Sequence, residues 1–172
     1  FLALAALTRR RLLLQPKDVY LLHSIYLADP DAFPDPATLS NLAVYADPKS
    51  KPKAWEMSLR QQWQRRGLVV RPEEVSRDPG EYILAWSLWD LNDLLDLQGI
   101  DGGVYVYSNS RAYDDEQAAD IERLRNWVRH MGLTLHGDPE EPSAISLHAS
   151  GHASGPQLAE FVQTVRPATL VP

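Results

Sequence analysis

The chain has 172 residues, a formal net charge of −6 at pH 7 and no cysteine. This length suits one domain, the acidic excess gives no general attraction to polyanions, and the lack of thiols excludes disulfides and thiolate metal sites. No apolar run reaches the ~18 residues that a membrane helix needs, and the positive charges follow the apolar opening FLALAAL, in the wrong order for a secretory signal. We therefore expect Phe1 to lie inside a longer natural chain, at the start of a core helix.

The first half of the sequence alternates short apolar runs with amphipathic segments. In chain order we expect a helix over 1–7, a strand over 11–15, a helix from Pro16 to about Leu27, a strand over 41–46, a helix over 54–66 and one helical turn at 72–74. Prolines between 29 and 38 force a loop. Trp55, Leu59 and Trp63 recur every four residues, and such a stripe is typical of a buried helix face rather than of a base-stacking surface.

The second half continues the alternation. The expected elements are a strand over 82–86, a helix over 89–99 that Ser87 caps, a strand over 104–107, a helix from Asp114 or Asp115 to Met131, a strand over 133–136, a strand over 144–147, a helix over 156–165 and a strand over 168–171. Asp90, Asp93 and Asp96 recur every three residues, so we expect these carboxylates along one solvated side of their helix. Their spacing is not that of a calcium loop.

This order of elements predicts the fold class. Strands that alternate with helices give an α/β fold, here a mostly parallel sheet with helices on both faces, in three layers joined by right-handed crossovers. The chain has no internal repeat, no low-complexity segment and no convincing linker. We therefore expect a single domain over 1–172.

The segment 148–155, HASGHASG, carries two histidines between an expected strand and an expected helix. Open α/β sheets bind ligands at the carboxyl ends of their strands, and backbone amides at a helix start attract anions. Because Ser150 and Gly151 separate His148 from His152, a regular helix that presents both rings to a metal is disfavoured. Spacing alone leaves a metal site, an anion site and a structural loop open.

Two stretches carry a family resemblance. The sequences GGVYVYSNSRAYDDEQAADIERLRNWVRHMGL, from Gly102, and SLHASGHASGPQLAEFVQTVRPATLVP, from Ser146, resemble the β-CASP portion of metallo-β-lactamase-fold nucleases. The nearest group is the ribonuclease J type with its uncharacterised bacterial and archaeal relatives. The signature is HxSGHA, then a helix, then a strand with RPxxLVP, and the front half matches loosely.

The resemblance implies a larger enzyme. In that family the Rossmann-like β-CASP domain is inserted into a metallo-β-lactamase domain, whose HxHxDH cluster holds two zinc ions, and RNA or single-stranded DNA enters between them. This sequence has no such cluster. The resemblance thus implies a β-CASP domain of a cytoplasmic, RNA-processing hydrolase, inactive without its missing metallo-β-lactamase domain and that domain's zinc. It implies no membrane partner, and it leaves oligomeric state open, with a homo-oligomer among the alternatives.

The resemblance also assigns residue roles. His152 matches the family histidine that points at the scissile phosphate, as a general acid or a stabiliser of phosphate charge. The expected phosphate and substrate contacts are His148, Ser150, Gly151, Ser108 and Asn109. Capping of the next helix is an equally good interpretation of Ser108 and Asn109. The alternative function is a non-catalytic scaffold that binds a polynucleotide or a protein; a nucleotide-binding enzyme is weaker, since no GxGxxG or GxxxxGK[ST] follows any strand.

Overall fold

The computed structural model describes residues 1–46, 51, 53–141, 145, 147–148 and 151–170. The helices are α1 (Leu2–Leu7), α2 (Pro16–Ala28), α3 (Ala54–Arg65), α4 (Pro72–Arg77), α5 (Asp115–His130) and α6 (Gly155–Val165), with 3₁₀ helices η1 (Pro36–Thr38), η2 (Pro79–Glu81) and η3 (Leu88–Asp96). The strands are β1 (Arg11–Leu14), β2 (Leu42–Tyr45), β3 (Val69–Val70), β4 (Tyr82–Ala85), β5 (Val104–Val106) and β6 (Thr134–His136). Only β3 has no counterpart among the expected strands, because two residues are too short for a pattern.

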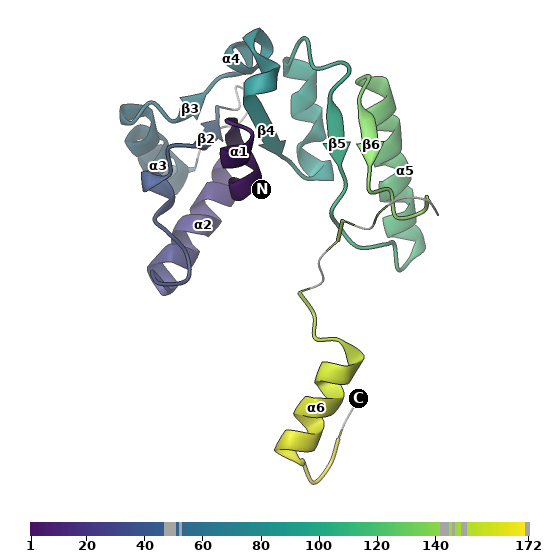
Figure 1. Ribbon diagram of the computed structural model, residues 1–172. Helices are drawn as coiled ribbons and strands as arrows, with labels where there is room; N and C mark the ends of the chain where they lie inside the picture. Colours follow the sequence, from purple (N-terminus) through teal and green to yellow (C-terminus); the bar gives the residue numbers. More distant parts are fainter. Residues whose placement is uncertain (47–50, 52, 142–144, 146, 149–150, 171–172) are drawn as a thin grey trace.

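Four parallel strands in the order β3-β2-β1-β4 form the first sheet (Figure 1). Successive side chains of a strand point to opposite faces. Leu12 and Leu14 therefore pack on one side, against residues of α1, α2 and α3, whereas Leu13 packs on the other side, against residues of α4 and η3. The predicted α/β fold, a mostly parallel sheet between helical layers, is confirmed.

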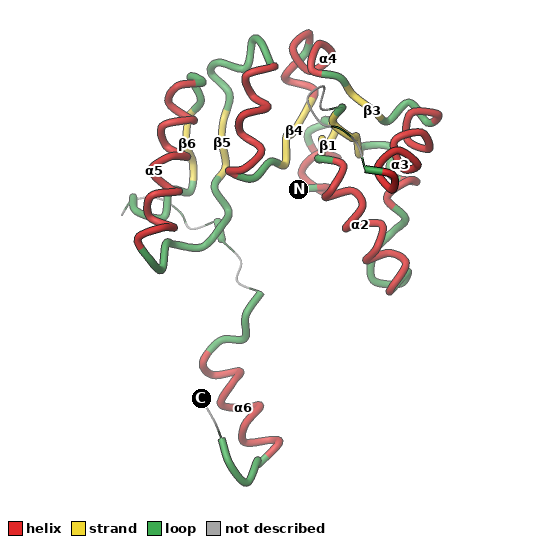
Figure 2. The backbone as a smooth tube through the Cα atoms, turned by 180° about the vertical axis from the view of Figure 1, so that it is seen from behind, coloured by secondary structure: helices red, strands yellow, loops and turns green. Residues whose placement is uncertain are grey.

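The second sheet contains only β5 and β6, which are also parallel. On one face, Tyr105 and Leu135 pack with Leu124 and Val128 of α5 in the core. The expectation of one continuous sheet is corrected here, because in the described part of the chain β4 pairs only with β1 and β5 only with β6. The helical segment η3 stands between β4 and β5 in both views (Figures 1 and 2).

The carboxyl-terminal part departs most from the expected pattern. The helix α6 forms as predicted, but it has no buried residue and lies apart from both sheets (Figures 1 and 2). The strand expected at 168–171 is absent from 168–170, and Val171 lies outside the described residues. Ile145 and Leu147 are not in a strand, and the rest of the 144–147 prediction falls outside the described residues. A strand needs a ladder partner, and the described residues here have none.

The predicted core stripe of α3 is confirmed. Trp63 is 1% exposed, and half-buried Trp55 packs on Tyr20 of α2 with ring centroids 4.5 Å apart. The expected core helix at the amino terminus is correct only in part, because Ala5 is the buried residue of α1 while Leu7 is largely exposed. Among the described residues, no helix combines the length and the apolar character that a membrane crossing requires.

A buried polar contact joins η3 to the end of β1. The Gln15 side-chain amide donates to Asp93 Oδ2 over 2.8 Å, and the two residues are only 6% and 7% exposed. Next to it, Lys17 Nζ lies 2.6 Å from Asp90 Oδ1. Burial of Asp90 opposes ionisation, but hydrogen bonds from Lys17 and Ser87 outweigh it and lower the pKa of this carboxyl. The prediction of a solvated carboxylate side is therefore wrong for Asp93.

We expect Asp93→Ala to lower the free energy of unfolding by about 1–3 kcal/mol, because it leaves the buried Gln15 amide without this acceptor. Urea denaturation followed by circular dichroism measures the change. The matched control is Asp31→Ala, at an exposed carboxylate, for which we expect a change within about 0.5 kcal/mol. Equal stability of the two variants would contradict a structural role for the Gln15–Asp93 contact.

Candidate functional site

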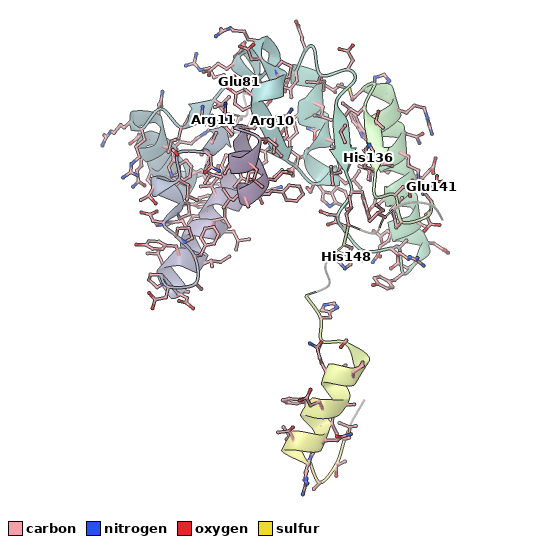
Figure 3. The ribbon with its side chains drawn as sticks, in the orientation of Figure 1. Arg10, Arg11, Glu81, His136, Glu141 and His148 are labelled. Carbon is pink, nitrogen blue, oxygen red and sulfur yellow. The ribbon has the colours of Figure 1, made fainter. Side chains whose placement is uncertain are left out.

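One predicted histidine lies beside two of the predicted polar residues. The Nδ1 atom of His148 is 3.2 Å from the carbonyl oxygen of Ser108, just beyond the carboxyl end of β5. His148 and Asn109 also line the same cavity. Figure 3 places His148 below β5 and β6, where the chain leaves toward α6. The structure thus brings together His148, Ser108 and Asn109 at the strand end where the sequence predicted a ligand site.

The other predicted residues of the histidine segment are not gathered there. Gly151 and His152 are exposed on the way to α6, and they line neither of the two cavities described below. Ser150 lies outside the described residues. His152 is not buried among apolar side chains, so it is accessible from solvent.

The cavity beside His148 has a volume of about 430 Å³ and lies between the start of η3, β5 and the first turns of α5. It is lined by the aromatic residues Trp89, Tyr105, Tyr107 and Tyr113, the apolar residues Leu88, Ala112, Ile121 and Leu124, and the polar residues Ser87, Asn109, Ser110, Arg111, Gln117, Asp120 and His148. An apolar, aromatic hollow with a few polar groups is the usual composition of a small-ligand site. Sequence reasoning missed its aromatic wall, although the SNSRAYDD loop was a usable signal because it follows a strand directly.

A larger cavity of about 900 Å³ follows the facing edges of β4 and β5. Its lining includes most of both strands together with Lys17, Asp18 and Asp90. Burial raises the pKa of the Asp18 carboxyl. Ser87 and Asn109 border this space as well as the smaller cavity, so the loop after β5 stands where the two meet.

The loop between β5 and α5 is held by local hydrogen bonds. The Tyr107 hydroxyl donates to the carbonyl oxygen of Ser110 over 2.8 Å. Asp114 is the amino-terminal cap of α5, because its carboxylate accepts from the Gln117 backbone amide over 2.8 Å. Neither Ser108 nor Asn109 therefore serves as that cap. Burial raises the pKa of Tyr105 to about 12, so its hydroxyl is neutral at physiological pH.

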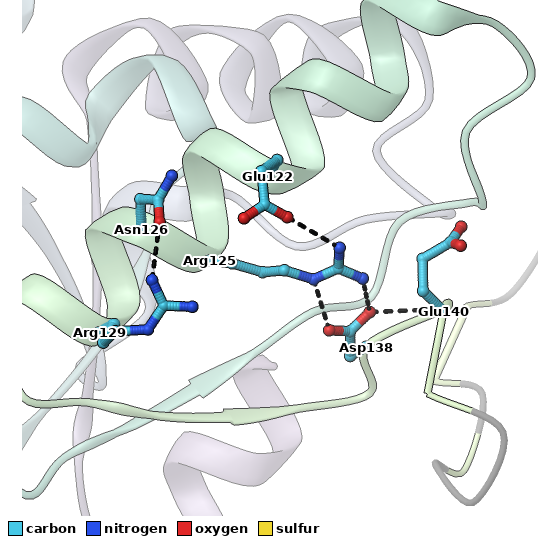
Figure 4. Close-up of polar contacts among 6 residues, drawn as sticks. All are labelled: Glu122, Arg125, Asn126, Arg129, Asp138 and Glu140. Atoms are coloured by element: carbon cyan, nitrogen blue, oxygen red, sulfur yellow. Dashed lines mark hydrogen bonds and ion pairs between the residues drawn. The ribbon is translucent and has the colours of Figure 1, made fainter.

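An arginine of α5 fixes the chain that follows β6. Arg125 donates from Nε and Nη2 to the two carboxylate oxygens of Asp138, over 2.8 and 2.7 Å, and from Nη1 to Glu122 (Figure 4). The hydrogen bonds from Arg125 hold the pKa of the Asp138 carboxyl below its ordinary value. This two-pronged contact fixes Asp138, two residues after the end of β6, against α5.

Gly137 lies where the loop after β6 passes the end of β5. Its φ is +79°, in the left-handed region, and an added Cβ would stand 2.5 Å from the Tyr107 carbonyl oxygen and 3.0 Å from Leu147 Cδ1. Only glycine fits both constraints. The close approach places Leu147, and with it His148, against the carboxyl ends of the two strands.

The mouth of the smaller cavity carries charges of both signs. Arg123 donates to Asp120 Oδ1 over 2.9 Å, and its guanidinium carbon lies 5.6 Å from the centre of the Trp89 ring. Arg111 is exposed on the adjoining loop. Within the described ranges, no three histidine, aspartate or glutamate side chains come together in a way that could hold a metal ion.

Comparison with known proteins finds no matching family model, no matching curated protein and no matching solved structure. The β-CASP resemblance therefore stays a prediction.

We expect Gly137→Ala to destabilise the protein by about 1–3 kcal/mol, because the new Cβ meets backbone in a left-handed conformation. Thermal and urea unfolding measure this change. Gly151→Ala is the control, since an added Cβ there has nothing within 4 Å. If both variants unfold alike, the close approach at Gly137 does not constrain the loop.

The Arg125–Asp138 pair predicts a pH-dependent contribution to stability. A carboxyl whose pKa is lowered in the folded state stabilises the protein at pH values above its ordinary pKa of 3.8. That stabilisation is lost as the pH falls through the folded-state pKa. We expect Asp138→Asn to cost about 1 kcal/mol at pH 7 and progressively less below about pH 4. Melting curves between pH 2 and pH 7 test this, with Glu140→Gln on the exposed side of the loop as control. A deficit that is independent of pH would contradict the ion pair as its cause.

Proposed function

We propose that this chain is the substrate-binding, β-CASP-type domain of a cytoplasmic, zinc-dependent phosphodiester hydrolase that processes RNA or single-stranded DNA. The observation that carries the proposal is the position of His148, beside the Ser108 carbonyl at the carboxyl end of β5 and on the wall of an aromatic cavity. Parallel α/β sheets use this edge for ligands, and a polynucleotide presents both phosphates and planar bases. The polar loop and the imidazole suit the phosphates, and the aromatic wall suits the bases.

The contact to Ser108 constrains the chemistry of His148. A carbonyl oxygen only accepts a hydrogen bond, so the 3.2 Å contact requires a proton on Nδ1. Nε2 is then an acceptor in the neutral ring and a donor in the charged ring. In this proposal Nε2 is the ring atom that meets a phosphate oxygen, while the Ser108 carbonyl orients the ring.

In this proposal His152 acts on the phosphate itself. Its exposure in the segment before α6 leaves it accessible to a bound strand, and an imidazole can donate a proton near neutral pH. The backbone amide of Gly151 is a further proposed phosphate contact, whereas Ser150 lies outside the described residues. Because the resemblance places both zinc ions in the missing metallo-β-lactamase domain, the proposed role of this chain is to bind and orient the strand.

A second candidate function is a non-catalytic scaffold that binds a protein. The observation that favours it is the exposure of three leucines of α1 and α2: Leu7, Leu21 and Leu27 are 83%, 59% and 66% exposed. Large apolar side chains left in water gain free energy when another protein surface covers them.

We expect labelled single-stranded RNA or DNA 12-mers to bind this chain. Arg111→Ala should weaken binding several-fold, and it should reduce the slope of log affinity against log salt concentration by about the contribution of one phosphate contact. Fluorescence anisotropy at several salt concentrations measures both. His148→Ala should weaken binding too, because it removes the imidazole beside Ser108. The matched control is Arg77→Ala, an exposed arginine in the last turn of α4.

Absence of binding by either strand, or equal effects of Arg111→Ala and Arg77→Ala, would overturn the polynucleotide site. Strand cleavage by the zinc-loaded natural protein separates the two candidate functions. A hydrolase loses cleavage in His152→Ala with its zinc content unchanged, whereas a scaffold shows no cleavage in either form.

A further inference from the structure

We infer that the cavity of about 430 Å³ beside His148 is a nucleobase pocket, in which one unstacked base of the bound strand lies against the indole of Trp89. The inference rests on the proposed function, since it names the part of the polynucleotide that the cavity receives. It adds a site to the phosphate contacts of the histidine segment.

Two exposed aromatic rings line this one cavity. Trp89 is 68% exposed and Tyr113 is 81% exposed, and both line this cavity. The chain has five tryptophans, and the other four, Trp55, Trp63, Trp86 and Trp127, are buried or half-buried. An aromatic ring left in water gives up the favourable free energy of its burial, and planar ligands recover that free energy by stacking.

Trp89 is held in place before any ligand arrives. Arg123 lies 5.6 Å from the centre of its ring and is itself bound to Asp120, three residues earlier on α5. A guanidinium above an indole face stabilises the ring orientation by a cation–π interaction. A fixed ring loses less conformational entropy when a base stacks on it, so the contact favours binding.

The cavity lining matches a nucleobase in its chemistry. Leu88, Ile121 and Leu124 supply an apolar floor, whereas Asn109 and Gln117 supply amides for the edge of a base. The Gln117 side-chain oxygen already accepts from the Tyr113 backbone amide over 3.0 Å, so its amino group is the part that faces a ligand edge as a donor. A flat apolar ring with polar edges fits such a lining.

The charges that line the cavity are balanced. Arg111 and Asp120 are its charged lining residues of opposite sign, and Asp120 is also paired with Arg123. This balance gives little net attraction to phosphates, so stacking supplies the affinity of the pocket. Stacking is nearly independent of salt, whereas the phosphate contact at His148 and Arg111 is screened by salt. The two contributions are therefore separable.

The test compares a single-stranded oligouridine 12-mer with a strand of equal length and charge whose residues are abasic. We expect the base-containing strand to bind about tenfold more tightly, to keep that advantage at high salt, and to quench tryptophan fluorescence where the abasic strand does not. Trp89→Ala should remove the advantage, and Trp89→Phe should restore most of it. Phe161→Ala, at an exposed aromatic residue of α6 outside the cavity, is the control and should change neither affinity.

The outcomes separate the pocket from the proposed function. Equal affinity for both strands, with Arg111→Ala weakening both, overturns the pocket and leaves the polynucleotide site in place. No binding of either strand overturns both. Equal weakening of both strands by Trp89→Ala assigns Trp89 a structural role and overturns the pocket. Quenching is measured on the unmodified protein, so the test holds even if Trp89→Ala fails to fold.

Discussion

The placement of η3 on the carboxyl end of β1 is the constraint on which the rest of this structure depends. Gln15 directly follows β1, and its side chain donates a hydrogen bond to Asp93 of η3 where both residues are almost fully buried. A buried polar side chain must find a partner, so the contact admits few other positions for the helix. Around it, Leu91, Leu94 and Leu97 join the core that contains Leu13 of the first sheet and Leu124 of α5. One nine-residue 3₁₀ helix thus connects the two sheets.

The position of η3 determines where the two cavities lie. Because η3 stands between β4 and β5, the two strands keep separate partners, and the edges between them border a cavity instead of forming a ladder. The amino-terminal end of η3 carries Trp89 to the loop after β5, opposite α5. The smaller cavity therefore depends on three elements distant in sequence, and its polar rim comes from the loop that Tyr107 holds through Ser110.

The proposed contacts are of two kinds, electrostatic contacts to phosphates and aromatic stacking on bases. The chain carries a net charge of −6, so a polyanion must be attracted locally, at the exposed Arg111 and at His148. The aromatic wall needs no net charge, since every base offers a planar face. The ion pair between Arg125 and Asp138 and the close approach at Gly137 keep the chain near His148 in place. Of the histidine segment, His148 lines the aromatic cavity.

The sequence by itself determined the α/β class, nearly all strands and helices up to His136, and the polar strand end at Ser108 and Asn109. These features follow from periodicity, turn residues and buried apolar runs, which act over a few residues. The tertiary structure alone decided that Asp93 is buried, that β5 and β6 form a sheet of their own and that Trp89 and Tyr113 line one cavity. It also left Ile145, Leu147 and the residues at 168–170 outside any sheet, since a strand pattern forms a ladder only where a partner edge is free. Such features depend on contacts between residues that are far apart in the sequence, and local spacing carries no information about those contacts.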